Sequence, residues 1–278
     1  MSLIRETRHL LRDYDIHPKK RYGQNFMVDG TVLQRLVSYA DLTGKDVVLE
    51  VGAGLGFLTR LLAEKCRKVI AFEVDPKLIL ALREQLRDLV NVELIEDDIL
   101  KASLPTFDKV VSTPPYSISS PLLFKVLEYP FRLAVLTFQQ EFAERLAASV
   151  GSKDYSRLTV ATYYKADVEL LDHVPRSAFF PSPDVDSTIV RLKPRKEPPF
   201  QVDNEVEFFE FLRGVFTQRN KRLRNAALVY LLRKRMTKAK AQELADSLTF
   251  HDKRVRELAP EDFGALSNEI LEKASFLR

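Results

Sequence analysis

The sequence has very little cysteine, few histidines and no long apolar run. Cys66 is its single cysteine, so the chain can form neither an intramolecular disulfide framework nor a cysteine-based zinc site. Its four histidines lie far apart in the sequence, and no metal-binding cluster is expected. The longest apolar runs are far shorter than the roughly 20 residues that span a bilayer, which excludes a transmembrane helix.

The N-terminal residues lack the features of a secretory signal. The start, MSLIRETRHLLRDYDIH, is charged throughout and has no apolar stretch of the kind that a signal peptide needs. We therefore expect a cytoplasmic protein with no bound metal and no membrane partner. With 278 residues, of which 45% are hydrophobic, the chain is long enough for one large domain and one small domain.

Acidic residues are missing from one long basic stretch. The net charge of the whole chain is only +4, but residues 213–240 contain ten Lys or Arg residues and no Asp or Glu. A charge run of this kind is usually a solvated helical face. Because this run is long and of one sign, a surface that binds a polyanion is the favoured interpretation.

Apolar segments alternate with helix-like segments over the first part of the chain. Strands are expected at 47–51, 68–74, 92–95, 109–112 and 133–138. Helices are expected over 57–66 and from about Asp75 and Ser119. This alternation predicts βαβ units and a parallel sheet. Two further runs, 158–164 and 185–192, are interpreted as strands of an antiparallel closing edge.

The composition changes after residue 193. The segment 193–199, KPRKEPP, is typical of a linker. Every periodic segment beyond it is helical, at 206–216, 222–233, 238–248 and 260–274. We therefore expect an α/β domain over residues 1–195, and a small all-α domain over residues 201–278 that carries the basic run.

A glycine-rich turn follows the strand expected at 47–51. Glycines at 52, 54 and 56 let the backbone approach a bound nucleotide closely before the next helix begins. NAD-dependent enzymes have a similar turn, but their third glycine lies one residue later, where this chain has Phe57. No proton-transfer residue lies near the turn, so an NAD-dependent oxidoreductase is disfavoured.

Acidic residues stand at the ends of the next two expected strands. Glu73 is placed to accept hydrogen bonds from ribose hydroxyls, and Asp98 from an adenine amino group, with Ile99 packing on the ring. Taken singly, each of these carboxylates is as often an ordinary loop residue as a ligand-binding one. Taken with the glycine turn, they favour an adenosine-containing cofactor, because such sites lie at the carboxyl ends of strands in open α/β sheets.

Motifs distributed over nearly the whole chain point to one family. The segment Thr113-Pro114-Pro115-Tyr116 is similar to the loop of enzymes that methylate the exocyclic amine of a base, although a lone Pro-Pro-Tyr is usually only a rigid turn. The other motifs are GQNFMVD (23–29), EVGAGLG (50–56), QQEFAERL (139–146), KDYSRL (153–158), FFPSPDVDS (179–187) and FTQRNKRLRN (216–225). Together they resemble those of the KsgA-type rRNA adenine dimethyltransferases, which are similar to the erythromycin-resistance rRNA methylases. Lys153-Asp154-Tyr155 is more similar to archaeal than to bacterial members.

The resemblance implies a Rossmann-like domain that binds S-adenosylmethionine, followed by a helical rRNA-binding domain. The cofactor-binding residues that it implies are Gln24, Asn25, Phe26, Met27, Gly52, Gly54, Glu73, Asp98, Ile99 and Thr113. The catalytic residues are Thr113, Pro114, Tyr116 and Phe179, with the two rings stacking on the faces of a flipped adenine. The first candidates for contact with RNA phosphates are Lys19, Lys20, Arg21, Arg219, Lys221, Arg222 and Arg224.

The catalytic loop departs from the family, which has Asn-Leu-Pro-Tyr or Asn-Ile-Pro-Tyr. Ser156 also replaces a usual glycine. Oxygen acceptors aimed at both N–H bonds of the adenine amine help the nitrogen toward tetrahedral geometry. Thr113 Oγ1 and the Pro114 carbonyl are the candidates here. Because threonine is shorter than asparagine, we expect slower catalysis but not its loss.

Several functions remain open on these grounds. The main one is a monomeric enzyme that converts two adjacent adenosines near the 3′ end of small-subunit rRNA to N6,N6-dimethyladenosine. The alternative is a ribosome-assembly factor of the same fold with weak or no catalysis, for which the threonine at 113 is the only support. A large-subunit adenine, the substrate class of the resistance enzymes, is a further candidate.

Overall fold

The computed structural model describes residues 2–19 and 22–276. The chain divides into two compact units, which are described separately below. Unit 1 is formed by residues 1–143 together with 168–194, and unit 2 by residues 144–167 together with 195–278. Within the described part of the chain, no helix is long and apolar enough to cross a membrane.

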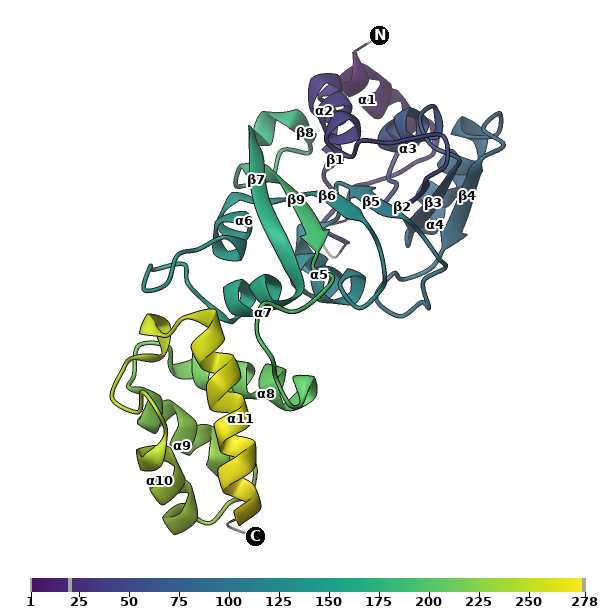
Figure 1. The fold of residues 1–278 in the computed structure, drawn as a ribbon. Helices are drawn as coiled ribbons and strands as arrows, with labels where there is room; N and C mark the ends of the chain where they lie inside the picture. The colour runs from purple at the N-terminus through teal and green to yellow at the C-terminus, as the bar shows by residue number, and fades with distance from the viewer. Residues whose placement is uncertain (1, 20–21, 277–278) are drawn as a thin grey trace. The chain divides into compact units, whose positions relative to one another are not determined.

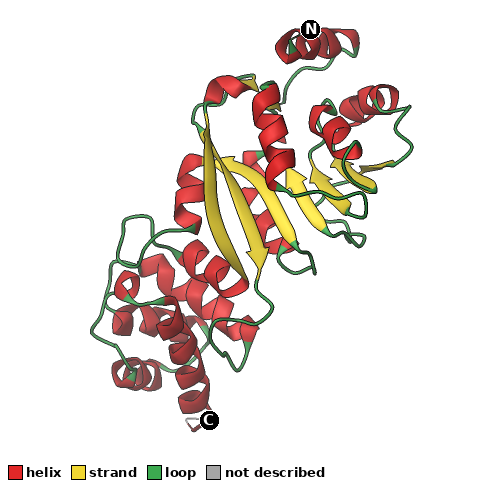
Figure 2. Ribbon diagram, turned by 45° about the horizontal axis from the view of Figure 1, so that its top comes forward, coloured by secondary structure: helices red, strands yellow, loops and turns green. Residues whose placement is uncertain are grey.

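Unit 1 is built around a seven-stranded sheet with the order β4-β3-β2-β5-β6-β9-β7 (Figures 1 and 2). Its strands are β2 (Val47–Val51), β3 (Lys68–Glu73), β4 (Val92–Glu96), β5 (Lys109–Ser112), β6 (Leu133–Gln139), β7 (Ala166–Val174) and β9 (Ser187–Pro194). Strands β2 to β6 pair in parallel, and β9 pairs antiparallel with β6. The predicted α/β fold is therefore confirmed.

Three helices connect parallel strands of unit 1, namely α3 (Phe57–Ala63), α4 (Pro76–Gln85) and α5 (Ser119–Val126). Helices α1 (Leu3–Asp13) and α2 (Gly30–Tyr39) precede β2, and α6 (Gln140–Leu146) follows β6 and runs past residue 143, where unit 1 breaks off. There are 3-10 turns at Tyr116–Ile118 and Arg176–Ala178. Helix α4 begins where the sequence predicts, because Asp75 Oδ1 accepts a hydrogen bond from the Lys77 amide at 3.2 Å and Pro76 occupies the first turn. All residues of β2 and β5 are buried, as expected for strands of a sheet covered on both faces.

A second, two-stranded sheet joins two motifs that lie far apart in the sequence. Strand β1 (Phe26–Met27) pairs antiparallel with β8 (Phe179–Phe180). Phe26 lies opposite Phe180, and Met27 lies opposite Phe179. Pairing of these strands therefore places the N-terminal motif at 23–29 beside the motif at 179–187.

The segment 158–164 is a helix, and its prediction as a strand was wrong. It lies in α7 (Arg157–Lys165), and the adjoining edge strand is instead β7. The Ser156 amide donates to Thr159 Oγ1 at 3.1 Å and so caps the first turn. Tyr164 packs on Phe208 at a ring-centroid distance of 5.1 Å. Capping and packing outweigh the weak strand preference of this β-branched run.

Unit 2 consists of helices. Besides α7, they are α8 (Glu205–Val215), α9 (Leu223–Arg233), α10 (Lys238–Ser247) and α11 (Pro260–Phe276), with 3-10 turns at Phe216–Gln218 and Val255–Glu257. Tyr155 packs on Phe216 at 5.9 Å, and its hydroxyl donates to the Leu258 carbonyl at 2.8 Å. These contacts explain why residues 144–167 belong to unit 2, although the sequence places them in the domain over 1–195. The functional roles assigned to the two domains remain predictions.

Asp46 joins the amino-terminal ends of the central strands. The residue is fully buried and immediately precedes β2. Its Oδ2 accepts a hydrogen bond from the Thr43 amide at 2.8 Å and pairs with Lys109 Nζ at 3.1 Å, while Oδ1 pairs with Arg132. Burial alone would raise the pKa of Asp46, but the bonds from Thr43 and Lys109 outweigh it and lower the pKa. Asp46 is therefore a charged carboxylate that stabilises the folded chain.

We expect Asp46→Ala to lower the free energy of unfolding by about 3–5 kcal/mol, because it leaves the buried Lys109 ammonium without this partner. Urea unfolding at neutral pH measures the change. A lowered pKa stabilises the fold above the usual pKa of aspartate, and this contribution is lost as the pH falls, so the difference should shrink in acid. The double variant with Lys109→Met should recover much of the loss. If the single variant Asp46→Ala and the double variant were destabilised equally, the pairing of Asp46 with Lys109 would be contradicted.

Candidate functional site

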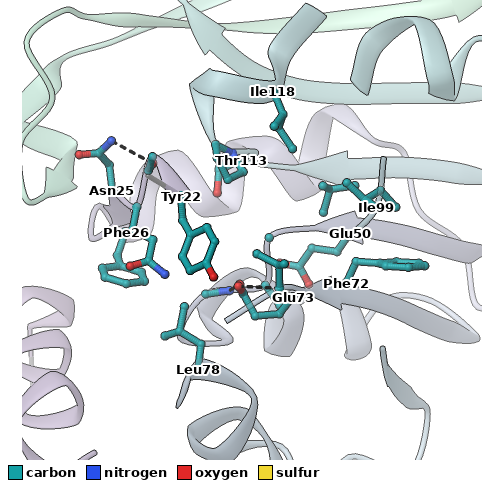
Figure 3. Close-up of a pocket in the computed structure, with 18 of the residues that line it drawn as sticks. Tyr22, Asn25, Phe26, Glu50, Phe72, Glu73, Leu78, Ile99, Thr113 and Ile118 are labelled. Carbon is teal, nitrogen blue, oxygen red and sulfur yellow. Dashed lines mark hydrogen bonds between the residues drawn. The ribbon is translucent and has the colours of Figure 1, made fainter. Parts of the chain in front are cut away.

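The carboxyl ends of β2 to β5 surround a cavity of about 280 Å³ (Figure 3). Every residue expected to bind the cofactor lies in its wall: Gln24, Asn25, Phe26, Met27, Gly52, Gly54, Glu73, Asp98, Ile99 and Thr113. The wall also contains residues that the sequence analysis did not select, among them Tyr22, Glu50, Phe72, Leu78 and Ile118. Side chains of the N-terminal segment thus face those at the strand ends across one cavity.

The glycine turn is needed for packing within the chain itself. Gly52 and Gly54 have φ angles of 75° and 59°, in the left-handed region that favours glycine. A Cβ atom at Gly52 would lie 3.1 Å from the Pro115 side chain, and one at Gly54 would lie 3.2 Å from Phe26. The turn therefore lies directly against both the N-terminal segment and the catalytic loop.

Glu73 at the end of β3 is held by backbone amides. Its Oε1 accepts from the amides of Val74 and Asp75 at 2.9 and 3.0 Å, and its Oε2 accepts from Gly54 at 3.0 Å. Burial nevertheless raises the pKa of Glu73, because desolvation outweighs these three bonds. A carboxylate has about four acceptor sites, so one remains on Oε2 for a further donor.

Glu50 in β2 is a buried acid whose Oε2 has no hydrogen-bond partner within the described residues. Only 2% of its surface is exposed. Burial, with a smaller contribution from the charge of Glu73, raises the pKa of Glu50 to about 8. Glu50 is the first residue of the EVGAGLG motif, and the motif alone indicates no separate role for it. The sequence does contain a sign of a special role, because Glu50 is the one acid in the otherwise apolar run 47–51.

Lys19 and Gln24 converge on Asp75, a fully buried acid. The Lys19 ammonium donates to both carboxylate oxygens of Asp75, at 3.0 and 2.9 Å, and Gln24 Nε2 donates to the same group at 2.9 Å. Gln24 Oε1 also accepts from the Lys19 amide at 2.7 Å. Lys19 therefore has a protein partner where the sequence analysis expected an RNA phosphate. Both side chains hold the N-terminal segment at the cavity.

Asp98 and Ile99 follow β4 in the same wall. Asp98 Oδ1 accepts from the Leu100 amide at 3.0 Å, and Oδ2 lies 3.4 Å from Lys101 Nζ on the surface. Ile99 is buried, with 4% of its surface exposed. The expected contact with an adenine ring stays a prediction, and these positions are compatible with it.

A second, smaller cavity of about 10 Å³ lies beside the first. Its wall contains all four expected catalytic residues, Thr113, Pro114, Tyr116 and Phe179, together with Gly23, Asn25 and Thr137. Thr113, Gly23 and Asn25 line both cavities. The loop 113–116 therefore lies between a space large enough for a small molecule and one the size of about one water.

Tyr116 and Phe179 contact each other edge to face. Their ring centroids are 6.1 Å apart, with an interplanar angle of 72°. A base stacked between two rings needs them parallel and roughly 7 Å apart, twice the usual contact distance. The predicted stacking thus requires the rings to turn. Tyr116 is also bonded through its hydroxyl to Ser187 Oγ at 2.5 Å, and burial raises its pKa to about 12.

Three of the four unit 2 residues that were expected to bind RNA have protein partners there. Arg222 and Arg224 share the Asp252 carboxylate, at 2.9 and 3.4 Å, and Arg219 donates to the Tyr155 carbonyl at 3.3 Å. Lys221 is exposed and forms no ion pair with the residues that the structure describes. Lys20 and Arg21 lie outside the described residues. Lys221 is therefore the most available of these cations in unit 2.

Glu50 makes the stability of the protein depend on pH. Its folded pKa of about 8 lies above the ordinary 4.5, so between these values unfolding releases a proton and stability falls as the pH rises. We expect Glu50→Gln to lack this fall, which amounts to at most about 1.4 kcal/mol per pH unit. Thermal unfolding of both proteins across this pH range tests it. If the stability of the wild type and of Glu50→Gln changed with pH in the same way, the raised pKa of Glu50 would be contradicted.

Comparisons with known proteins identify the family. The sequence profile described as "Ribosomal RNA adenine dimethylase" matches residues 16–270. The "Probable ribosomal RNA small subunit methyltransferase A" of the archaeon Methanosarcina barkeri is 45% identical over 274 residues, covering 98% of this chain and 94% of that protein. These matches confirm the resemblance inferred from the motifs.

Two solved structures share the fold. A dimethyladenosine transferase from Plasmodium falciparum has a TM-score of 0.75 and 32% identity, covering 88% of this chain and 97% of its own. The 23S rRNA methyltransferase ErmE has a TM-score of 0.64 and 32% identity, and the match covers 88% of this chain and 99% of the ErmE chain. With a parallel sheet of this topology and the expected site residues gathered at one edge of it, the chain belongs to the ribosomal RNA adenine dimethylase family.

Proposed function

We propose that this protein uses S-adenosylmethionine to dimethylate N6 of two adjacent adenosines near the 3′ end of small-subunit rRNA. The observation that supports this most strongly is the position of Thr113 in the walls of both cavities. If the large cavity holds the cofactor and the small cavity holds the base, the methyl group has to pass this loop. The protein acts as a monomer in the cytoplasm, on rRNA in the small ribosomal subunit or its precursor.

The residues around the large cavity suit S-adenosylmethionine. The remaining acceptor site on Glu73 Oε2 can take a ribose hydroxyl, and Ile99 offers an apolar surface for the adenine. Glu50 Oε2, unpartnered within the described residues, and Asn25 add polar groups at the other walls. The cofactor supplies the methyl group as an electrophile on a sulfonium. The chain has to bind it, exclude water and position the amine.

The small cavity supplies acceptors rather than a strong base. Thr113 Oγ1 and the Pro114 carbonyl are the proposed acceptors for the N–H bonds of the target amine. Tyr116, with its pKa raised to about 12, stays a neutral phenol at physiological pH and serves as a stacking surface. Burial of the loop is therefore compatible with a mechanism that needs positioning and no ionised side chain.

Methyl transfer to small ribosomal subunits that lack the modification tests the proposal. Nucleoside mass spectrometry after incubation with labelled S-adenosylmethionine should detect N6,N6-dimethyladenosine. Thr113→Asn, which restores the longer family side chain, should raise the rate by roughly tenfold to a hundredfold and lower the monomethyl share. An unchanged product ratio would contradict the role of Thr113 as an acceptor. No methylated adenine, with subunit and cofactor still bound, would favour the assembly-factor alternative.

Charges in unit 2 provide a separate test of RNA binding. Lys221→Gln should weaken binding to small-subunit rRNA and lower the slope of log affinity against log salt by about one. Asp252→Asn should tighten binding by about two- to fivefold, because it frees Arg222 and Arg224 from a shared exposed carboxylate. Filter binding at several salt concentrations measures both. Two variants that bind like the wild type would remove this surface from the RNA contact.

A further inference from the structure

Thr137 in β6 is a buried hydroxyl side chain in the wall of the small cavity. None of its surface is exposed, and its Oγ1 has no hydrogen-bond partner among the described residues. A buried hydroxyl without a partner destabilises the folded chain, so such groups are uncommon and call for an explanation. The position of Thr137 offers one.

The register of the sheet places Thr137 beside Thr113. Strands β5 and β6 are parallel, and Ser112 pairs with Leu136 at the end of the ladder. Thr113 directly follows the end of β5 and Thr137 directly follows Leu136 in β6, and adjacent strands lie roughly 4.8 Å apart, so extending the register by one residue brings the two threonines close together. Because side chains alternate along a strand, residues in register lie on the same face. Both threonines accordingly line the small cavity.

Thr137 differs from the other buried hydroxyls that lack a partner. In the described part of the chain these are Thr7, Thr59, Ser119, Ser152 and Thr162. None of them lines either cavity. Thr59 lies beside the Glu50 carboxyl, and the others lie elsewhere in the chain, whereas Thr137 lines the small cavity proposed for the target amine. The unused hydrogen-bonding capacity of Thr137 is therefore located where a substrate group can take it up.

We propose that Thr137 Oγ1 contacts the target adenine and shares with Thr113 Oγ1, as a bifurcated acceptor pair, one N–H bond of its exocyclic amine, while the Pro114 carbonyl accepts the other. This inference rests on the proposed function and adds a residue to the same site. A threonine hydroxyl has two acceptor sites, so it can accept an N–H without losing or gaining a proton. No bond is made or broken at Thr137; it holds the amine while the methyl group is transferred.

The proposal also explains why the short side chain of Thr113 is expected to slow catalysis without abolishing it. An acceptor at position 113 reaches less far into the base pocket than an asparagine oxygen would. A second hydroxyl on the neighbouring strand offers an acceptor from an adjacent direction, fixed by the register of β5 and β6. The two threonines thus divide between them the positioning of the amine.

Thr137→Val tests the proposal, because valine has nearly the same shape but no hydroxyl. We expect kcat for dimethyladenosine formation to fall roughly tenfold to a hundredfold, with unchanged Kd for S-adenosylmethionine and for the small subunit. The melting temperature should rise by about 2–4 °C, because the variant buries no unsatisfied hydroxyl. Thr137→Ser keeps the oxygen and should retain most of the activity.

Thr7→Val is the matched control. Thr7 lies in α1 of unit 1, is fully buried and also has an unpartnered Oγ1, but it lines neither cavity. This variant should gain thermal stability without a change in kcat. Opposite effects on stability and activity at Thr137, with a gain in stability alone at Thr7, would distinguish substrate contact from a packing role.

Combining variants tests whether the two threonines act together. In a Thr113→Asn background, the longer acceptor should make Thr137 less necessary, so Thr137→Val should then lower kcat by less than about threefold. If the wild type methylates rRNA and Thr137→Val is equally active, the role of Thr137 is overturned, but the proposed function stands. A loss of activity accompanied by a lower melting temperature or by weaker cofactor binding overturns that role as well. A wild type that methylates no rRNA adenine overturns the proposed function and this inference with it.

Discussion

The site depends on the parallel pairing of β5 between β2 and β6. Parallel strands end at the same edge of a sheet, so this pairing gathers the glycine turn after β2, the loop after β5 and Thr137 near the end of β6. Glu73, at the end of β3, joins them through the next pairing. A register shift of one residue would turn the side chains of a strand to the opposite face. The geometry of the site is therefore a property of the whole sheet.

Buried polar groups of unit 1 differ in whether they have partners. Asp46 and Asp75 are paired with cations and hydrogen-bonded, which holds their pKa values low and stabilises the fold. Glu50 and Thr137 line the cavities and each keep an oxygen without a partner in the described residues. Unsatisfied groups of this kind weaken the folded state. The position of these two in the cavity walls is consistent with stability given up for function.

The N-terminal segment completes the site from outside the large sheet. It is held at two points, by the bonds of Lys19 and Gln24 to Asp75 and by the pairing of β1 with β8. Residues 22–27 of this segment line the large cavity. Asp75 also caps α4, so one buried carboxylate positions both a helix and this segment. The wall of the large cavity thereby depends on a contact between segments that are distant in sequence.

The sequence alone was enough to predict where the parallel strands lie along the chain, the glycine turn, the acids at or after the ends of two of the strands and the loop 113–116 as a candidate site. These features depend on local residue chemistry and on spacing along the chain, which can be read without a structure. Only the tertiary structure decided that 158–164 is a helix, that Lys19 pairs with Asp75 and that Thr137 stands beside Thr113 without a partner. Each of these depends on contacts between segments far apart in the sequence, and such contacts outweigh local preference.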